Sequence, residues 1–194
     1  MGKGAATRDT VIGEALRQAV AVGLEGLSLG GLAETLSLSK SGLFAHFKSK
    51  EALQLAVLEE AREQFQRKVI EPAFAAPRGR PRFEALFARW LDWIEGDGSL
   101  RGCIFSVASQ EYDDRPGAVR DRLVETQNDW HELLARLATD LPAEGKAPVA
   151  YGRQLAFEFV GIGLSFQMHC KLMNRRDARE RAEEAFARLL VSSE

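Results

Sequence analysis

The residues best placed to do chemistry lie in one short run near the N-terminus. From Ser39 to Lys50 the sequence reads Ser-Lys-Ser-Gly-Leu-Phe-Ala-His-Phe-Lys-Ser-Lys, which mixes hydroxyl-bearing and basic side chains with apolar ones. Hydroxyl and amine groups bind phosphate oxygens and base edges, and short side chains let a helix approach a duplex closely. The run is therefore typical of a surface that contacts DNA.

Two short helices must position this run, and both have clear start signals. Ser28 is placed to cap a first helix, and Ser39 is placed to cap a second helix over Lys40–His46. The turn between them is Ser37-Leu38-Ser39, and an amphipathic helix over about residues 8–22 precedes them. Two helices joined in this way form a helix-turn-helix, whose second helix enters the major groove.

Helical spacing divides the side chains of this region into an inner and an outer set. The inner set comprises Leu32, Ala33, Leu36, Leu38, Leu43 and Phe47. The outer set comprises Lys40, Ser41, Gly42, Ala45 and His46. We also interpret Phe44 as a core residue that touches the DNA backbone only by van der Waals contact. His46 has two interpretations, as a phosphate contact or as a brace against Phe47.

Basic residues flank the start of the next helix, which we predict over residues 50–70, ending before Pro72. Lys48 and Lys50 lie where free backbone N–H groups and the positive end of the helix dipole favour a phosphate. Solvated surface charge is the alternative for both lysines and for Lys40.

The stretch from Ser39 to Leu53 resembles the TetR family of bacterial regulators, whose pattern is Ser-Lys-Gly-Thr-Leu-Tyr-x-His-Phe followed by Ser-Lys-Glu-x-Leu. Ser28 also lies where that family usually has Thr. The similarity covers about residues 8–55. It implies a helix-turn-helix DNA-binding domain over residues 1–49 and a helical regulatory domain over residues 50–194. It further implies a homodimer formed through the last two long helices as a four-helix bundle.

Several residues depart from the family pattern. Phe44 replaces a Tyr and Gly42 replaces a Thr whose hydroxyls often reach phosphate, so we expect two neutral contacts to be absent. Gly30 and Gly31 stand where charged residues are common, and each glycine costs a helix about 0.5–1 kcal/mol relative to Ala. We expect the first helix of the pair to be soft until DNA or packing orders it.

The rest of the chain repeats apolar residues at three- and four-residue intervals without strand-like alternation, which predicts an all-α protein of roughly nine helices. A proline-rich surface loop is expected over residues 72–81. The later helical segments are expected at about 82–95, 101–111, 117–141, 148–173 and 176–191. Breaks at 96–98, 114–116 and 142–148 separate them.

Composition narrows the class of protein further. The net charge is −2, yet residues 1–50 carry six basic and four acidic side chains, the sign expected if only this part meets phosphate. Cys103 and Cys170 have no CxxC spacing, and no apolar export segment opens the chain. No apolar run reaches the roughly 18 residues of a membrane span. We therefore expect a reduced, cytoplasmic protein with no membrane contact.

The helical body offers more large apolar side chains than a thin bundle needs. Our candidate ligand-binding residues are Trp90, Phe105, Trp130, Phe166 and His169. Each has a core role as its alternative, but an apolar cavity with a few polar groups is the usual small-molecule site. Polar groups for it are available from Gln110, Gln127, His131, Gln167 or His169. His169 and Cys170 are adjacent on a helix and point apart, so we expect no metal site.

Residues 155–166 are apolar nearly all the way round, so that helix needs cover on more than one side. Gly161 and Ser165 are four residues apart and give it a small-residue face that another helix can approach. A second copy of the chain is one cover for this helix. The centre of the monomer is the alternative.

These patterns lead to a first hypothesis of a homodimeric repressor on a palindromic, double-stranded DNA operator. A small hydrophobic or aromatic effector would release it, with the helix over residues 50–70 as the lever. A second hypothesis is an enzyme or small-molecule carrier in which the helix-turn-helix is only structural. No nucleophile with its base, phosphate loop or metal cluster is evident, so we expect no enzyme and no cofactor. A third is an architectural DNA-binding protein without a ligand, which the acidic balance disfavours.

Overall fold

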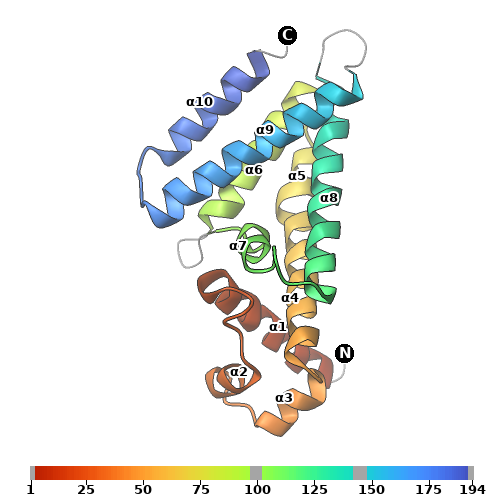
Figure 1. Ribbon diagram of the computed structural model, residues 1–194, viewed down its shortest axis with the longest axis vertical. Helices are drawn as coiled ribbons and strands as arrows, with labels where there is room; N and C mark the ends of the chain where they lie inside the picture. Colours follow the sequence, from red (N-terminus) through yellow and green to blue (C-terminus); the bar gives the residue numbers. More distant parts are fainter. Residues whose placement is uncertain (1–2, 97–101, 142–147, 192–194) are drawn as a thin grey trace. The chain divides into compact units, whose positions relative to one another are not determined.

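The computed structural model describes residues 3–96, 102–141 and 148–191, and the regular structure in these ranges is entirely helical (Figure 1). This confirms the all-α prediction. The helices are α1 (Lys3–Val22), α2 (Leu29–Thr35), α3 (Lys40–His46), α4 (Lys50–Phe65), α5 (Glu71–Phe74), α6 (Arg80–Glu95), α7 (Ile104–Glu111), α8 (Ala118–Ala138), α9 (Val149–Gln167) and α10 (Ala178–Val191). Two π-helical turns, η1 (Gln66–Ile70) and η2 (Met168–Leu172), follow α4 and α9.

The chain forms two compact units. The first combines residues 1–64 with 103–125, and the second combines residues 65–102 with 126–194. The first unit therefore includes α7 and the first residues of α8. These units differ from the predicted domains, 1–49 and 50–194, whose boundary stays a prediction.

The first unit has an aliphatic core contributed by short helices. Leu24, Leu32, Leu43 and Leu53 are fully buried, as is Ala15 on α1. Serine caps set where three of the helices begin. The Oγ atoms of Ser28, Ser39 and Ser49 accept hydrogen bonds from the N–H groups of Gly31, Gly42 and Ala52, each at 3.0 Å.

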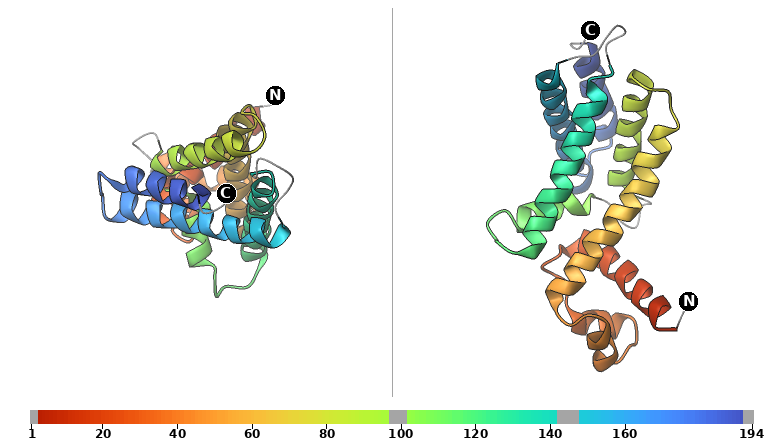
Figure 2. Two further views of the ribbon diagram at one scale, coloured as in Figure 1. Left: turned by 90° about the horizontal axis from the view of Figure 1, so that it is seen from above. Right: turned by 90° about the vertical axis from the view of Figure 1, so that its right-hand side faces the viewer.

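The second unit has an aromatic core shared by α6, α9 and α10. Phe87 stacks on Phe186 with ring centroids 4.0 Å apart, and Trp90 stacks on Phe159 at 5.4 Å. A Cβ atom on Gly163 of α9 would lie 2.1 Å from the Trp90 ring, so the glycine lets α6 and α9 approach closely. Helices α9 and α10 lie side by side in the views from different directions (Figure 1, Figure 2).

The prediction that the fourth helix ends before Pro72 is wrong. The winding continues from α4 through η1 into α5, with Pro72 in the first turn of α5. The π-helical turn directly before it pairs the Glu71 N–H with the Gln66 carbonyl. Proline is tolerated there because N–H groups of a first turn need no partner within their own helix. The expected loop over residues 72–81 is correspondingly shorter, because α5 and α6 occupy both of its ends.

The later segments match their expected positions within a few residues, and the segment expected over 148–173 consists of α9 and η2. The break at 114–116 is present between α7 and α8. Residues 97–98 and 142–147 of the other two predicted breaks lie outside the described residues. Among the helices of the described ranges, none combines the length and apolarity needed to cross a membrane.

Candidate functional site

Helices α2 and α3 are joined by a tight turn over residues 36–39. The backbone of Ser37 is in the left-handed region, with φ of 54°. Leu36 N–H donates to the Leu32 carbonyl at 3.0 Å, and Leu38 N–H donates to the Ala33 carbonyl at 2.9 Å. These bonds end α2 and turn the chain sharply into α3. The result is the geometry of a helix-turn-helix.

Helix α3 has one buried and one exposed face. Leu43 is fully buried, and Phe47 directly after the helix is buried as well. Lys40, Ser41, Gly42 and Ala45 are exposed, and His46 is half-buried. The outer set predicted from the spacing is thus on the solvent side of the helix, where its hydroxyl and amine groups are accessible to a ligand.

Phe44 corrects one expectation. We interpreted its side chain as part of the core, but it is 52% exposed. The reason is its phase on the helix. Leu43 and Phe47 are four residues apart on one face, and Phe44 is rotated by about 100° from Leu43. Its ring is therefore available at the surface beside Lys40 and Ser41, within the same helix.

The flanking lysines differ in their surroundings. Lys48 is exposed, whereas Lys50 is half-buried in the first turn of α4. The Nζ atom of Lys50 donates to the backbone carbonyl of Glu25 at 2.6 Å and to its Oε2 atom at 3.1 Å. A phosphate must compete with this ion pair for the amine of Lys50.

Glu25 is the centre of a polar cluster that we call the Glu25 cluster: Glu25, Lys50, Gln54, Tyr112 and Arg115. Its Oε1 atom accepts a hydrogen bond from the Tyr112 hydroxyl at 2.6 Å, and Arg115 Nη1 lies 3.4 Å from Oε2. Gln54 Nε2 donates to the Leu24 carbonyl at 2.9 Å and lies 3.5 Å from Oε1 of Glu25.

These partners shift two proton equilibria. The hydrogen bond from Tyr112, followed by that from Lys50, lowers the pKa of Glu25 from about 4.5 to about 2, so the carboxylate is charged at neutral pH. Burial, together with the bond to this carboxylate, raises the pKa of Tyr112 well above its usual range. Tyr112 thus remains a hydrogen-bond donor at any physiological pH. Sequence reasoning missed this cluster, because its members are up to 90 residues apart and form no local pattern.

A second bond joins the same segments. Glu111 Oε2 accepts from the Leu24 N–H at 2.8 Å. Gly23 makes room for this carboxylate, because a Cβ atom there would lie 1.7 Å from Glu111 Oε1, and its φ of +81° also favours glycine. The end of α7 is therefore bonded to the turn that precedes α2 through two consecutive residues, Glu111 and Tyr112.

The predicted ligand-binding residues lie on α6, α7, α8, α9 and η2. Trp90 and Trp130 meet in the second unit with ring centroids 5.7 Å apart. Phe166 and His169 line a groove between α9 and α10. Phe105 is buried in α7, within the first unit.

Two polar atoms add a signal that the sequence did not give. Within the described ranges, Trp93 Nε1 and the Tyr151 hydroxyl are buried without a hydrogen-bond partner. Phe65 packs edge-on against both Trp93 and Trp130, at 5.5 and 5.0 Å. An unpaired buried donor beside apolar rings is costly unless a further molecule satisfies it.

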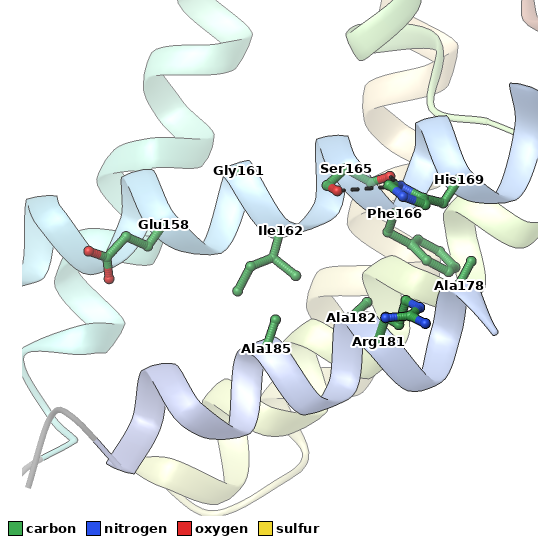
Figure 3. A pocket seen from close by; sticks show the side chains of 10 residues that line it. All are labelled: Glu158, Gly161, Ile162, Ser165, Phe166, His169, Ala178, Arg181, Ala182 and Ala185. Carbon is green, nitrogen blue, oxygen red and sulfur yellow. Dashed lines mark hydrogen bonds between the residues drawn. The ribbon is translucent and has the colours of Figure 1, made fainter. Parts of the chain in front are cut away.

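The groove between α9 and α10 has a volume of about 460 Å³. Its walls are formed largely by small residues, among them Gly161, Ala182 and Ala185 (Figure 3). Glu158 lies at one end, and Arg181 lies toward the other end (Figure 3).

Other large apolar side chains near the groove are exposed. They include Phe157, Leu164 and Met168, on α9 and at the start of η2. An exposed apolar face of this kind is typical of a surface that another molecule covers. In the parts of the chain that the structure describes, no three His, Cys, Asp or Glu side chains are grouped to hold a metal ion.

Comparison with known proteins gives matches over most of the chain. Residues 11–57 match the family described as bacterial regulatory proteins, tetR family, and residues 79–186 match the tetracyclin repressor-like C-terminal domain. A search of curated proteins returned no match.

Solved structures share the fold. A TetR-family transcriptional regulator from Streptomyces coelicolor superposes with a TM-score of 0.84 at 20% identity, over 100% of this chain and 98% of the other. A TetR regulator from Chloroflexus aurantiacus gives 0.81 at 21% identity, over 98% and 96%. The protein AibR, solved with isovaleryl coenzyme A and operator DNA, gives 0.74 at 18% identity, over 94% and 97%.

Proposed function

Because this chain belongs to the TetR family of bacterial regulatory proteins, we propose that it represses transcription from a palindromic operator and leaves the DNA when a small apolar ligand binds. The observation that carries the proposal is the exposed face of α3, whose small and basic side chains face solvent while Leu43 on the opposite face is buried. The cytoplasm is the compartment in which such a protein meets its DNA.

The proposed DNA-contacting residues belong to α3 and its flanks. They are Ser28, Ser39, Lys40, Ser41, Gly42, Phe44, Ala45, His46, Lys48 and Lys50. Lys40 and Lys48 bind phosphates, and the hydroxyl of Ser41 reads base edges. The exposed ring of Phe44 touches the DNA backbone by van der Waals contact, which needs no hydroxyl group.

Two copies of α3 must reach successive major grooves, about 34–36 Å apart. TetR-family regulators act as dimers. We propose that the partner subunit covers the groove between α9 and α10, because this face is apolar, lined by small residues and exposed in the single chain. The four helices of the two subunits then form a bundle.

The effector is proposed to bind among the aromatic side chains of the second unit. Trp93 Nε1 offers a buried donor beside Phe65, and Trp130 packs edge-on against the same ring. This favours an apolar or aromatic molecule that carries one hydrogen-bond acceptor. Such a ligand must discriminate between DNA-competent and incompetent forms by about 5.5 kcal/mol to switch nearly all of the population.

Selection of bound DNA from a random pool tests the regulator directly. We expect a palindrome whose half-sites are centred 10–10.5 base pairs apart, or a multiple of this spacing. The double variant Lys40→Ala with Lys48→Ala should lower the affinity for that palindrome and reduce its salt dependence. Arg89→Ala, which removes one positive charge from α6, is a control and should bind normally. A pool that shows no enrichment at moderate salt would refute the proposal.

A further inference from the structure

The Glu25 cluster brackets the helix-turn-helix. Glu25 lies three residues before the α2 cap Ser28, and Lys50 begins the helix that follows α3. The amine of Lys50 bonds to both the backbone carbonyl and the carboxylate of Glu25. The two ends of the DNA-reading segment are therefore joined to each other through these side-chain bonds.

Helix α7 is joined to the same point. Tyr112, which is buried, donates to the Glu25 carboxylate at 2.6 Å, and Glu111 accepts from the Leu24 N–H at 2.8 Å. Arg115 adds an ion pair from the turn after α7 at 3.4 Å. Hydrogen bonds to a charged group are short and roughly twice as strong as neutral ones. A displacement of this end of α7 must therefore break these bonds or carry the turn before α2 with it.

We propose that Glu25 is a positioning residue for DNA binding, and that the Tyr112–Glu25–Lys50 chain makes operator affinity depend on where the end of α7 lies. This inference rests on the proposed function. Glu25 need not touch DNA in this role. It sets the orientation of α2 and α3 from their two ends, so that the exposed face of α3 meets the groove correctly.

The sign of a charge effect separates positioning from simple electrostatics. A carboxylate near DNA repels phosphate, so neutralising it by Glu25→Gln should strengthen binding if charge were its only contribution. Loss of positioning has the opposite effect. We expect Glu25→Gln to bind the selected palindrome about fivefold more weakly, because a neutral amide keeps only about half the strength of the charged bonds.

Glu34→Gln is the matched control, because Glu34 is an exposed residue of α2 and loses the same charge. We expect this variant to bind as well as the natural sequence or more tightly. Weaker binding by both variants, or stronger binding by Glu25→Gln, would overturn the proposal.

Tyr112→Phe tests the link to α7 while keeping the ring and every charge. We expect it to weaken binding about tenfold, as loss of one charge-assisted hydrogen bond would. The slope of log affinity against log salt should stay unchanged, because no phosphate contact is removed. A change of slope by about 0.9 would instead indicate a lost phosphate contact and contradict the positioning role.

A double-mutant cycle completes the test. If Tyr112 acts through Lys50, the effects of Tyr112→Phe and Lys50→Met on operator affinity are not additive. Fluorescence anisotropy on the selected palindrome measures all four proteins, and circular dichroism shows that each is folded. Additive effects would refute the chain of contacts. Failure of the unmodified protein to select any palindrome would refute the proposed function instead.

Discussion

Each of the two compact units is stabilised internally by a different kind of contact. In the first unit, segments far apart in sequence meet through charged hydrogen bonds around Glu25, above a core of leucines. In the second unit, α6, α9 and α10 meet mainly through stacked rings such as Phe87 on Phe186. Charged hydrogen bonds are directional, whereas apolar contact is largely not. The first arrangement therefore fixes the orientation of the segments that it joins, and the second fills a core with large apolar side chains.

The largest effect should come from emptying the aromatic core. Phe159 is fully buried and packs against the rings of Trp90, Phe83 and Phe186. We expect Phe159→Ala to lower the free energy of unfolding by about 3–5 kcal/mol, measured by urea denaturation. Phe44→Ala, which truncates a 52% exposed ring, should change it by less than about 0.5 kcal/mol. Equal losses of unfolding free energy in the two variants would mean that the stacked rings do not stabilise the second unit.

Close approach of α6 and α9 predicts the next effect. Gly163→Ala places a Cβ atom 2.1 Å from the Trp90 ring, so one of the two helices must move. We expect a loss of about 1–3 kcal/mol in unfolding free energy. Gly13→Ala in α1 meets nothing within 4 Å and should instead stabilise the protein by about 0.5–1 kcal/mol. A stabilising Gly163→Ala would contradict the tight crossing.

The third prediction tests charge pairing between two subunits at the groove between α9 and α10. Glu158 and Arg181 lie toward opposite ends of the groove (Figure 3). If the two-fold axis of the dimer runs through the middle of the groove, perpendicular to its length, Glu158 of each subunit comes to the end where Arg181 of the other subunit lies. Glu158→Arg alone and Arg181→Glu alone should each weaken the dimer at least about tenfold, because like charges then meet twice. The double variant should restore it. Sedimentation equilibrium measures all three, and a double variant as weak as the single ones would exclude this pairing.

The smallest expected effect is on how the free energy of unfolding depends on pH. Glu25 has a pKa of about 2 in the folded chain and about 4.5 when unpaired, so its bonds stabilise the fold above pH 4.5 and are lost as the pH falls toward 2. Glu25→Gln should therefore lose less unfolding free energy than the natural sequence between pH 6 and pH 3. The difference should stay below about 1 kcal/mol, because the side chain is 39% exposed. Urea denaturation at both pH values measures it, with Glu34→Gln expected to behave as the unmodified protein.

Local signals in the sequence predicted the short helices near the N-terminus well. The helix over Lys40–His46 was predicted to the residue, because its Ser39 cap is an interaction across three positions. Phe44 was misassigned because the composition of a short helix does not fix which apolar residues face inward. The winding past Pro72 was missed because the π-helical turn that accommodates it has no sequence signal of its own.

Contacts between distant segments explain the rest of what was missed. Lys50 was predicted as a phosphate contact because it begins a helix. No nearby residue indicates its bond to Glu25, which lies 25 residues earlier in the sequence. Tyr112 follows an unremarkable helix, and its role arises only when α7 meets the turn before α2. Among the ligand candidates, residue type alone did not separate Trp90 and Trp130 in one core from Phe166 beside a surface groove.

The bond between Lys50 and the Glu25 carbonyl closes a loop of the chain that contains α2 and α3. Glu25 and Lys50 both lie outside α3, so the exposed positions of α3 are free to vary while these two residues stay. The preference for an operator sequence can then change through substitutions on the exposed face of α3 alone. If a relative's sequence replaced the residues between Ser39 and Phe47, it would be held by the same bond between Lys50 and Glu25. Its operator affinity would then keep the proposed dependence on the end of α7.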